Sequence, residues 1–386
     1  MHEDKQGVQQ ETVKEAPAQK RREHTPLIHI SKRDVLPWQK AWLIRGGAIL
    51  LSMVFMGIVS LMLTGENPFV IYGTLFTGNF GYLGRIWTLL FNTAILLGIA
   101  LALTPAFRMR FWNIGAEGQV LFGGLLSVLV MIGMGKMENS WPNAIVLLMM
   151  LLVGVIGGAI WGLIPAIFKA IWGTNETLFT LMMNYVATGL VAFSIQALFP
   201  KGTGTMGVVN SSSYLGWLPK IGTNNYLLTI LIVLVMTVLM YIYLRYSKQG
   251  YEISVVGESE NTARYVGINV KKVILRTMAI SGAICGLIGF LLVSGYNHSI
   301  STDAVGGRGF TAIMVCWLAK FNPIFMFLTS FLICFLEQGA AEVASKCGIS
   351  AAYADILVGI VLFFIIGCEF FIQYRVRFNC SKKEAA

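Results

Sequence analysis

Apolar residues occur along this chain in long, nearly unbroken runs, and polar residues are concentrated between the runs. Because about 20 helical residues cross the ~30 Å hydrocarbon core of a bilayer, runs of this length predict transmembrane helices. We predict ten, of which the eighth is short. Their ranges are 42–63, 84–105, 117–135, 142–168, 177–199, 225–244, 273–295, 307–320, 323–339 and 354–374.

The ends of the chain lack this pattern. Residues 1–40 mix charges of both signs with almost no apolar periodicity, which is typical of a disordered tail. We expect a transmembrane domain over 41–375 with a long polar loop at 245–272, followed by a second tail at 376–386. The predicted fold class is therefore an all-α, polytopic membrane protein.

Composition agrees with lipid as the solvent, because 56% of the residues are hydrophobic and only 12% are charged. Soluble domains carry about 25% charged residues, so the composition excludes a disulfide scaffold and disfavours a large soluble enzyme. The net charge of +10 would suggest nucleic acid in a soluble protein. Here the positions of the charges decide what that excess means.

If the N-terminus is cytoplasmic, 23 of the 29 Lys and Arg residues fall on the cytoplasmic side of the predicted helices. The positive-inside rule expects such a split. An odd number of spans would put the basic C-terminal tail outside, so the charges favour an even number. We expect a cell-membrane protein with both termini in the cytoplasm, in contact with lipid and not with nucleic acid.

The sequence lacks the common motifs of catalysis. It contains no G-x-x-x-x-G-K-[ST], H-E-x-x-H or G-x-S-x-G, three of its four histidines precede residue 30, and its six cysteines form no C-x-x-C pair. We expect no catalytic residue, no metal and no cofactor. Any energy from ATP would have to come from another subunit.

Glycines recur at helical spacing in two of the predicted spans. The fourth contains Gly154, Gly158 and Gly162, and the seventh contains Gly282 and Gly286. Small residues at this spacing let helix backbones approach closely in lipid. We therefore predict that these two faces pack against other helices.

Two further glycine-containing stretches interrupt the apolar pattern. One, Phe107–Gln119, follows a predicted span that descends, and the other, His298–Phe310, follows a span that ascends. Corresponding breaks in segments of opposite direction indicate an inverted repeat with the translocation path at its interface. The alternative, that these glycines only mark loops, stays open.

Polar residues inside or at the ends of the spans are candidates for the path. An ionisable group such as Glu117 is costly at membrane depth and usually faces a bundle interior or a wet cavity. It could equally cap the broken helix, and the amides could bond one another across helices. Arg308, Glu337 and Glu369 are nearer span ends, where snorkelling explains them. The candidates for the translocation path are Asn92, Asn113, Glu117, Gln119 and Asn184.

The loop at 245–272 predicts a short helix of its own. Ser259 can cap a helix over residues 260–266, which Gly267 then ends. Ala263, Val266 and Ile268 give this helix a modest apolar face. It is suited to docking into a groove on a partner protein, or alternatively to lying on the lipid surface.

Four motifs in this order resemble one known family. The run N-I-G-A-E-G-Q at 113–119 resembles the N-I-G-x-E-G-Q signature of the inner-membrane permeases of ABC importers for simple sugars and nucleosides. V-G-E-S-E-N-T-A-R-Y-V-G-I at 256–268 resembles their coupling segment. S-G-A-I-C-G-L-I-G at 281–289 and G-F-T-A-I at 309–313 resemble two further stretches. The chain departs from the family at Ser259, Thr262 and residues 316–323.

The resemblance implies a type II importer-like permease of ten helices that works by alternating access. It also implies a homologous second permease subunit, a cytoplasmic ABC ATPase, and an extracytoplasmic lipoprotein that delivers the substrate. The branch that it resembles most serves nucleosides. The residues implied in coupling to the ATPase are Glu258, Ser259, Ala263, Arg264 and Gly267.

Two other function classes fit the sequence less well. An ion- or proton-coupled secondary transporter needs carboxylates at mid-membrane, and the middles of the predicted spans carry no Asp or Glu. A membrane-embedded enzyme needs clustered Asp, His or Cys near one face, which the sequence also lacks. The import permease therefore remains the leading hypothesis.

Overall fold

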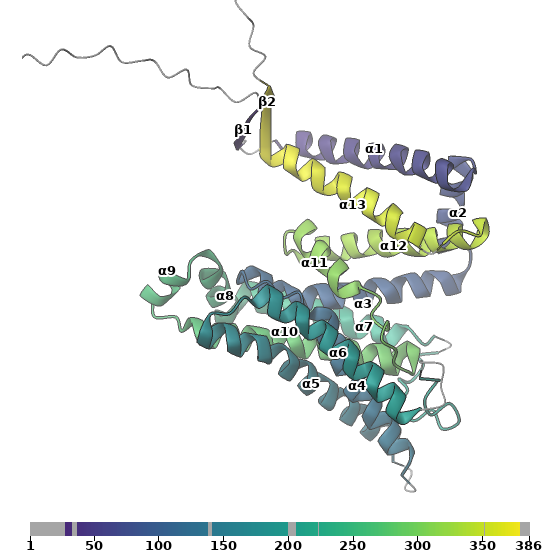
Figure 1. Cartoon of the computed structure of the whole chain (residues 1–386), viewed down its shortest axis with the longest axis vertical. Helices are drawn as coiled ribbons and strands as arrows, with labels where there is room; N and C mark the ends of the chain where they lie inside the picture. Colours follow the sequence, from purple (N-terminus) through teal and green to yellow (C-terminus); the bar gives the residue numbers. More distant parts are fainter. Residues whose placement is uncertain are drawn as a thin grey trace, which may run out of the picture. The chain divides into compact units, whose positions relative to one another are not determined.

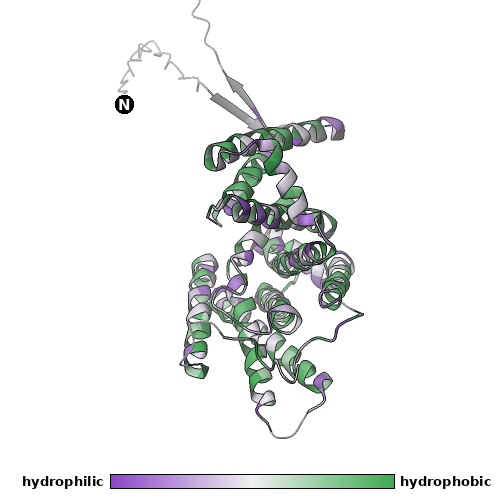
Figure 2. Cartoon of the chain, turned by 90° about the vertical axis from the view of Figure 1, so that its right-hand side faces the viewer, coloured by the Kyte–Doolittle hydropathy of each residue, from purple (hydrophilic) through white to green (hydrophobic). Residues whose placement is uncertain are grey.

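The computed structural model describes residues 28–32, 37–137, 141–199, 206–222, 224–350 and 352–378. Among these residues nine helices are long and apolar enough to cross a membrane (Figure 1). In Figure 2 most of their ribbon has the green of hydrophobic residues. The nine are α1 (Trp38–Thr64), α3 (Leu83–Arg108), α4 (Ala116–Gly135), α5 (Asn143–Trp172), α6 (Glu176–Leu198), α7 (Leu227–Tyr246), α10 (Val270–Leu292), α12 (Pro323–Cys347) and α13 (Ala352–Gln373).

Four shorter helices lie between the long ones. They are α2 (Pro68–Phe80), α8 (Lys248–Glu258), α9 (Glu260–Tyr265) and α11 (Arg308–Leu318), and a π-helical turn, η1 (Val293–Asn297), extends α10. The prediction of a polytopic, all-helical protein is confirmed. The eighth predicted span is α11, which has only 11 residues.

The chain divides into two compact units. The smaller consists of the residues before 52 and after 362. In it, β1 (Ile28–Lys32) pairs antiparallel with β2 (Tyr374–Phe378), and Arg45 forms an ion pair of 2.5 Å with Glu369. Residues 28–32 belong to the tail that we expected to be disordered, so that expectation is wrong for them. Residues 1–27, 33–36 and 379–386 of the two predicted tails lie outside the described residues.

This pairing brings the segment before α1 beside the segment after α13. Two ends that meet on one side of a membrane require an even number of crossings. The described residues contain nine helices long enough to cross, so the tenth crossing that the sequence predicts stays a prediction.

The larger unit, residues 52–362, is built around α4, α5 and α10. The glycines of α5 and α10 lie directly against each other. A Cβ atom added to Gly158 would lie 2.3 Å from the carbonyl oxygen of Gly282, and one added to Gly286 would lie 2.2 Å from that of Gly154. Since only glycine permits backbones this close, the predicted packing role is confirmed.

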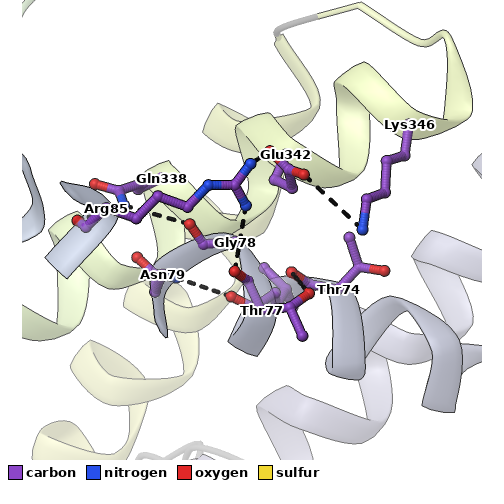
Figure 3. Close-up of polar contacts among 9 residues, drawn as sticks. Thr74, Thr77, Gly78, Asn79, Arg85, Gln338, Glu342 and Lys346 are labelled. Carbon is purple, nitrogen blue, oxygen red and sulfur yellow. Dashed lines mark hydrogen bonds and ion pairs between the residues drawn. The ribbon is translucent and has the colours of Figure 1, made fainter. Parts of the chain in front are cut away.

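The ninth span is longer than predicted. We expected it to end at 339, but α12 continues to Cys347. Figure 3 shows why the polar residues there remain helical. Glu342 forms an ion pair of 2.8 Å with Arg85, and the Gln338 amide donates to the Arg85 carbonyl oxygen at 3.1 Å. Because α2 and α3 satisfy these polar groups, the helix does not need to stop where the hydropathy falls.

The same network explains α2, which we did not predict. Asn67 accepts a hydrogen bond from the Phe69 amide, with Pro68 at the first helical position, so the helix has an ordinary start signal. Asn79 then donates to the Phe335 carbonyl oxygen of α12 at 2.8 Å (Figure 3 shows Asn79). At 13 residues, α2 is too short to span a bilayer.

Candidate functional site

Two breaks in the helical pattern meet in the larger unit. The first is the loop 109–115 between α3 and α4, and the second is the loop 298–307 between η1 and α11. Gly306 and Gly307 adopt positive φ angles of 62° and 73°, which favour glycine, and α11 begins directly after them. Both breaks are therefore followed by a helix that starts inside the bundle.

Glu117, in the first turn of α4, joins the two helices. One carboxylate oxygen accepts the Gly307 N–H at 3.0 Å, and the other accepts the Gly309 N–H at 2.7 Å. The first N–H groups of a helix have no partner within the helix and carry a partial positive charge. The Glu117 carboxylate supplies both the acceptor and the charge that the start of α11 requires.

The other polar residues of the motif hold the first loop in place. The Asn184 side chain on α6 accepts the Gly118 N–H at 2.8 Å and donates to the Ile114 carbonyl oxygen at 2.9 Å. The buried side chains of Asn113 and Gln119 pair with each other at 3.3–3.4 Å. The amides of Asn113, Gln119 and Asn184 thus bond within the bundle, the alternative that the sequence left open.

Asn92 has a different neighbour. Its side-chain oxygen accepts a hydrogen bond of 3.1 Å from the Arg308 guanidinium, at the first position of α11. Arg308 also interacts electrostatically with Glu117 and with Glu337 of α12. We define Asn92, Glu117, Arg308 and Glu337 as the polar junction.

Sequence reasoning missed two members of this junction. The sequence predicts that Arg308 and Glu337 lie near span ends and snorkel to the interface. In the structure Arg308 adjoins the Glu117 contacts, and Glu337 lies ten residues before the end of α12. For Glu337 the error came from ending the ninth span at 339, and the longer α12 places this carboxylate in the middle of a span, contrary to the prediction that span middles carry none.

The predicted coupling loop contains two helices. Ser259 separates them, and its hydroxyl accepts the Thr262 N–H at 3.2 Å to begin α9. Gly267, at φ 82°, follows the last turn. The predicted short helix is confirmed, whereas α8 was missed. Ala263 is fully buried against the chain's own helices, while the neighbouring Tyr265 is 91% exposed.

A pocket of about 260 Å³ opens beside α9. Glu258, Glu260 and Arg110 are among the residues that line it. Lys169 and Glu176, which also line it, form an ion pair of 2.8 Å. Arg264 pairs with Glu260 at 3.4 Å on the exposed face of α9. This end of the bundle therefore presents a charged surface around a short capped helix.

Metal chemistry finds no support in the part of the chain that the structure describes. No group of three or more His, Cys, Asp or Glu side chains is arranged there to hold a metal ion. The polar junction has two carboxylates, but Glu117 is bonded to backbone N–H groups of α11. Its chemistry is hydrogen bonding and charge complementarity.

Residues 85–366 match the protein family described as the permease component of branched-chain amino acid transport systems. The guanosine ABC transporter permease protein NupP of Bacillus subtilis is 30% identical over 87% of this chain and 94% of its own. The glucose ABC transporter permease protein TsgB13 of Haloferax volcanii is 28% identical over 90% and 93%. The nucleoside ABC transporter permease protein NupB of Lactococcus lactis is 27% identical over 82% and 89%.

Proposed function

We propose that this chain, which belongs to the family of permease components of branched-chain amino acid transport systems, forms the path for nucleosides or related simple sugars in an ATP-driven importer. Membership makes the chain a multi-pass permease subunit that is not itself an enzyme, with an ATPase and a substrate-binding protein as its partners. The substrate class rests on the guanosine, glucose and nucleoside permeases to which it is similar.

The observation that carries the proposed path is the contact between Glu117 and the start of α11. Helices that begin inside a membrane are tolerated where their ends are satisfied by protein or line a cavity. The polar junction gathers polar side chains from α3, α4, α11 and α12 at such a point. A polar solute that crosses the bilayer needs hydrogen-bonding groups at this depth.

Coupling to the ATPase is assigned to α9 and its borders. Glu258, Arg264 and the exposed Tyr265 offer side chains to a partner. Ser259 and Gly267 set the start and end of the helix, and the buried Ala263 fixes it on the permease. Movement of a docked ATPase would then be transmitted through α8 and α10, against which α9 packs.

The full importer would contain a homologous second permease and an extracytoplasmic lipoprotein. With α9 facing a cytoplasmic ATPase, both termini lie in the cytoplasm, which agrees with the distribution of Lys and Arg. The loops 206–222 and 298–307 then face the binding protein. Alternating access would expose the polar junction first to this side and then to the cytoplasm.

The test is uptake by proteoliposomes that hold the chain with its second permease, its ATPase and its binding protein. Labelled guanosine and labelled glucose are supplied outside, with ATP or a non-hydrolysable analogue inside. We expect accumulation of at least one solute with ATP and none with the analogue. Accumulation without ATP that a protonophore abolishes would instead support a secondary transporter.

A further inference from the structure

Two helices of the larger unit, α3 and α11, end in the same backbone motif. In each, an N–H group donates to the carbonyl oxygen five residues earlier, at 2.9 Å from Phe111 and at 3.1 Å from Phe321. This closure is the Schellman motif, whose left-handed residue is usually glycine. Here Arg110 and Lys320 occupy that position, at φ 60° and 49°. Backbone strain of this kind is typical of functional segments.

Beside these two motifs, Trp112 stacks on Trp317. The ring centroids are 5.5 Å apart and the ring planes are inclined by 21°. Phe107, in the last turn of α3, meets both rings edge-on at 6.0 and 6.2 Å. The two indoles are 45% and 48% exposed, so they do not belong to the buried core. The stack joins the loop 109–115 to the last turn of α11.

This loop and the start of α4 hold α11 at both of its ends. Trp112 contacts the last turn of α11. At the first turn, Glu117 accepts the N–H groups of Gly307 and Gly309 at 3.0 and 2.7 Å. Trp112 and Glu117 are only five positions apart in the sequence. A short helix that one short segment holds at both ends moves with that segment.

The end of α8 lies against the start of the same segment. A Cβ atom added to Gly257 would collide with the Arg108 carbonyl oxygen and would lie 3.3 Å from the Met109 Cα atom. Because this is backbone against backbone, no side chain can rearrange to absorb a displacement of α8. The pocket of about 260 Å³ is lined both by residues 109–111 and by residues 256–260, so the loop has room to move.

We propose that the stack of Trp112 on Trp317 transmits the movement of α9 to α11. The inference rests on the proposed function, in which the ATPase docks on α9. A displacement of α9 moves α8, and α8 moves the end of α3 at Arg108. The Schellman closure carries this movement to Trp112, and the stack carries it to α11 and its Arg308. Trp112, Trp317 and Gly257 are therefore positioning residues for transport.

The experiment measures solute molecules taken up per ATP hydrolysed by the reconstituted complex, with labelled guanosine and labelled glucose. Trp317→Leu keeps an apolar side chain but removes the stacked ring. We expect this ratio to fall about tenfold, the effect of ~1.4 kcal/mol and the upper end for an aromatic pair. ATP hydrolysis and the melting temperature should stay close to those of the original chain. Trp317→Phe, which keeps a ring, should restore most of the ratio.

Two further variants separate transmission from general damage. Trp112→Leu removes the same contact from its other side, so the double variant should lose no more than either single variant. The matched control is Trp172→Leu at the end of α5. Trp172 is also exposed, and its ring packs against Phe168 of its own helix at 5.0 Å. We expect the control to leave the ratio unchanged.

An unchanged ratio in Trp317→Leu overturns the proposed transmission, even if uptake and ATP hydrolysis fall in parallel, because a parallel fall indicates lost docking or lost folding. A tenfold lower ratio in Trp172→Leu overturns it as well, as do additive losses in the double variant. If the original complex accumulates neither guanosine nor glucose with ATP, the proposed function itself fails.

Discussion

At the scale of single residues, Glu117 shows how a carboxylate can be retained within a membrane bundle. Its cost of burial is offset by two backbone N–H donors at the start of α11. The nearby Arg308 adds an electrostatic contribution. The residue is therefore structural and functional at once, because the helix that it caps carries the arginine of the junction.

Replacing Glu117 should lower stability in a defined order. Glu117→Ala leaves two part-buried N–H groups without an acceptor, which costs about 3 kcal/mol. Glu117→Gln keeps one acceptor oxygen, so its stability should lie between that of the original chain and that of Glu117→Ala. Thermal unfolding in detergent measures the series, with the exposed Glu66→Ala as the control. Equal stability of Glu117→Ala and Glu66→Ala would contradict the capping role.

His298, which follows η1, should make stability depend on pH. Burial lowers the pKa of His298 to about 4, and its ring stacks on Trp217 at 3.6 Å. The folded state favours the neutral form of His298. The resulting contribution to the free energy of unfolding is therefore complete above about pH 6.5 and is lost as the pH falls toward 4. His298→Gln should flatten the pH dependence of the melting temperature between pH 6.5 and 4. Parallel profiles for the two proteins would refute this assignment.

The sequence allowed part of this site to be predicted. Glu117, Asn113 and Gln119 were found because they lie in one short motif around a broken helix, and Asn184 because it is a polar amide inside a predicted span. Their partners could not be found, since Gly307 and Gly309 are about 190 residues away and the contact depends on tertiary packing. Arg308 and Glu337 were misjudged because their depth depends on helix boundaries that hydropathy alone places poorly.

At the scale of elements, the α5–α10 contact should not tolerate a side chain. Gly286→Val would put its Cβ atom against the Gly154 carbonyl oxygen and force the helices apart. We expect a loss at the upper end of about 1–3 kcal/mol, seen as a lower melting temperature. Gly189→Val on α6 is the control, because a Cβ there meets nothing within 4 Å. Similar losses in both variants would show that glycine spacing is not the cause.

The short α9 should be required for coupling and not for folding. Arg264 is exposed, so Arg264→Glu should leave the melting temperature unchanged but lower substrate-stimulated ATP hydrolysis by the assembled complex about tenfold. Lys271→Glu, an equal charge change just inside α10, serves as the control. Retained stimulation in Arg264→Glu would remove that residue from the docking surface.

Most elements were predictable because membrane helices carry a strong hydropathy signal. The two that were missed, α2 and α8, have 13 and 11 residues, so they do not produce a full-length apolar run. The extension of α12 was missed for a different reason. Its polar residues are satisfied by Arg85 and by backbone groups of α2 and α3, contacts that do not appear in a hydropathy pattern.

At the scale of the whole molecule, the distribution of charge and the strand pairing both constrain the number of membrane crossings. The distribution of Lys and Arg favours an even number of crossings. The β1–β2 pairing requires an even number as well, although it was not foreseen. Nine helices of the described residues are long enough to cross, so a tenth crossing by the segment with the short α11 stays a prediction. This segment contributes Arg308 to the polar junction.

The central claim is that the solute passes this junction, and cysteine labelling tests it most directly. Asn92→Cys is placed in the reconstituted complex and treated with a water-soluble thiosulfonate reagent, which reacts with thiolates in contact with water. Leu234→Cys, on the exposed apolar face of α7, is the control. We predict that Asn92→Cys reacts, that guanosine or glucose slows its reaction, and that Leu234→Cys is unaffected by either solute. An unreactive Asn92→Cys in a complex that still transports would contradict the account.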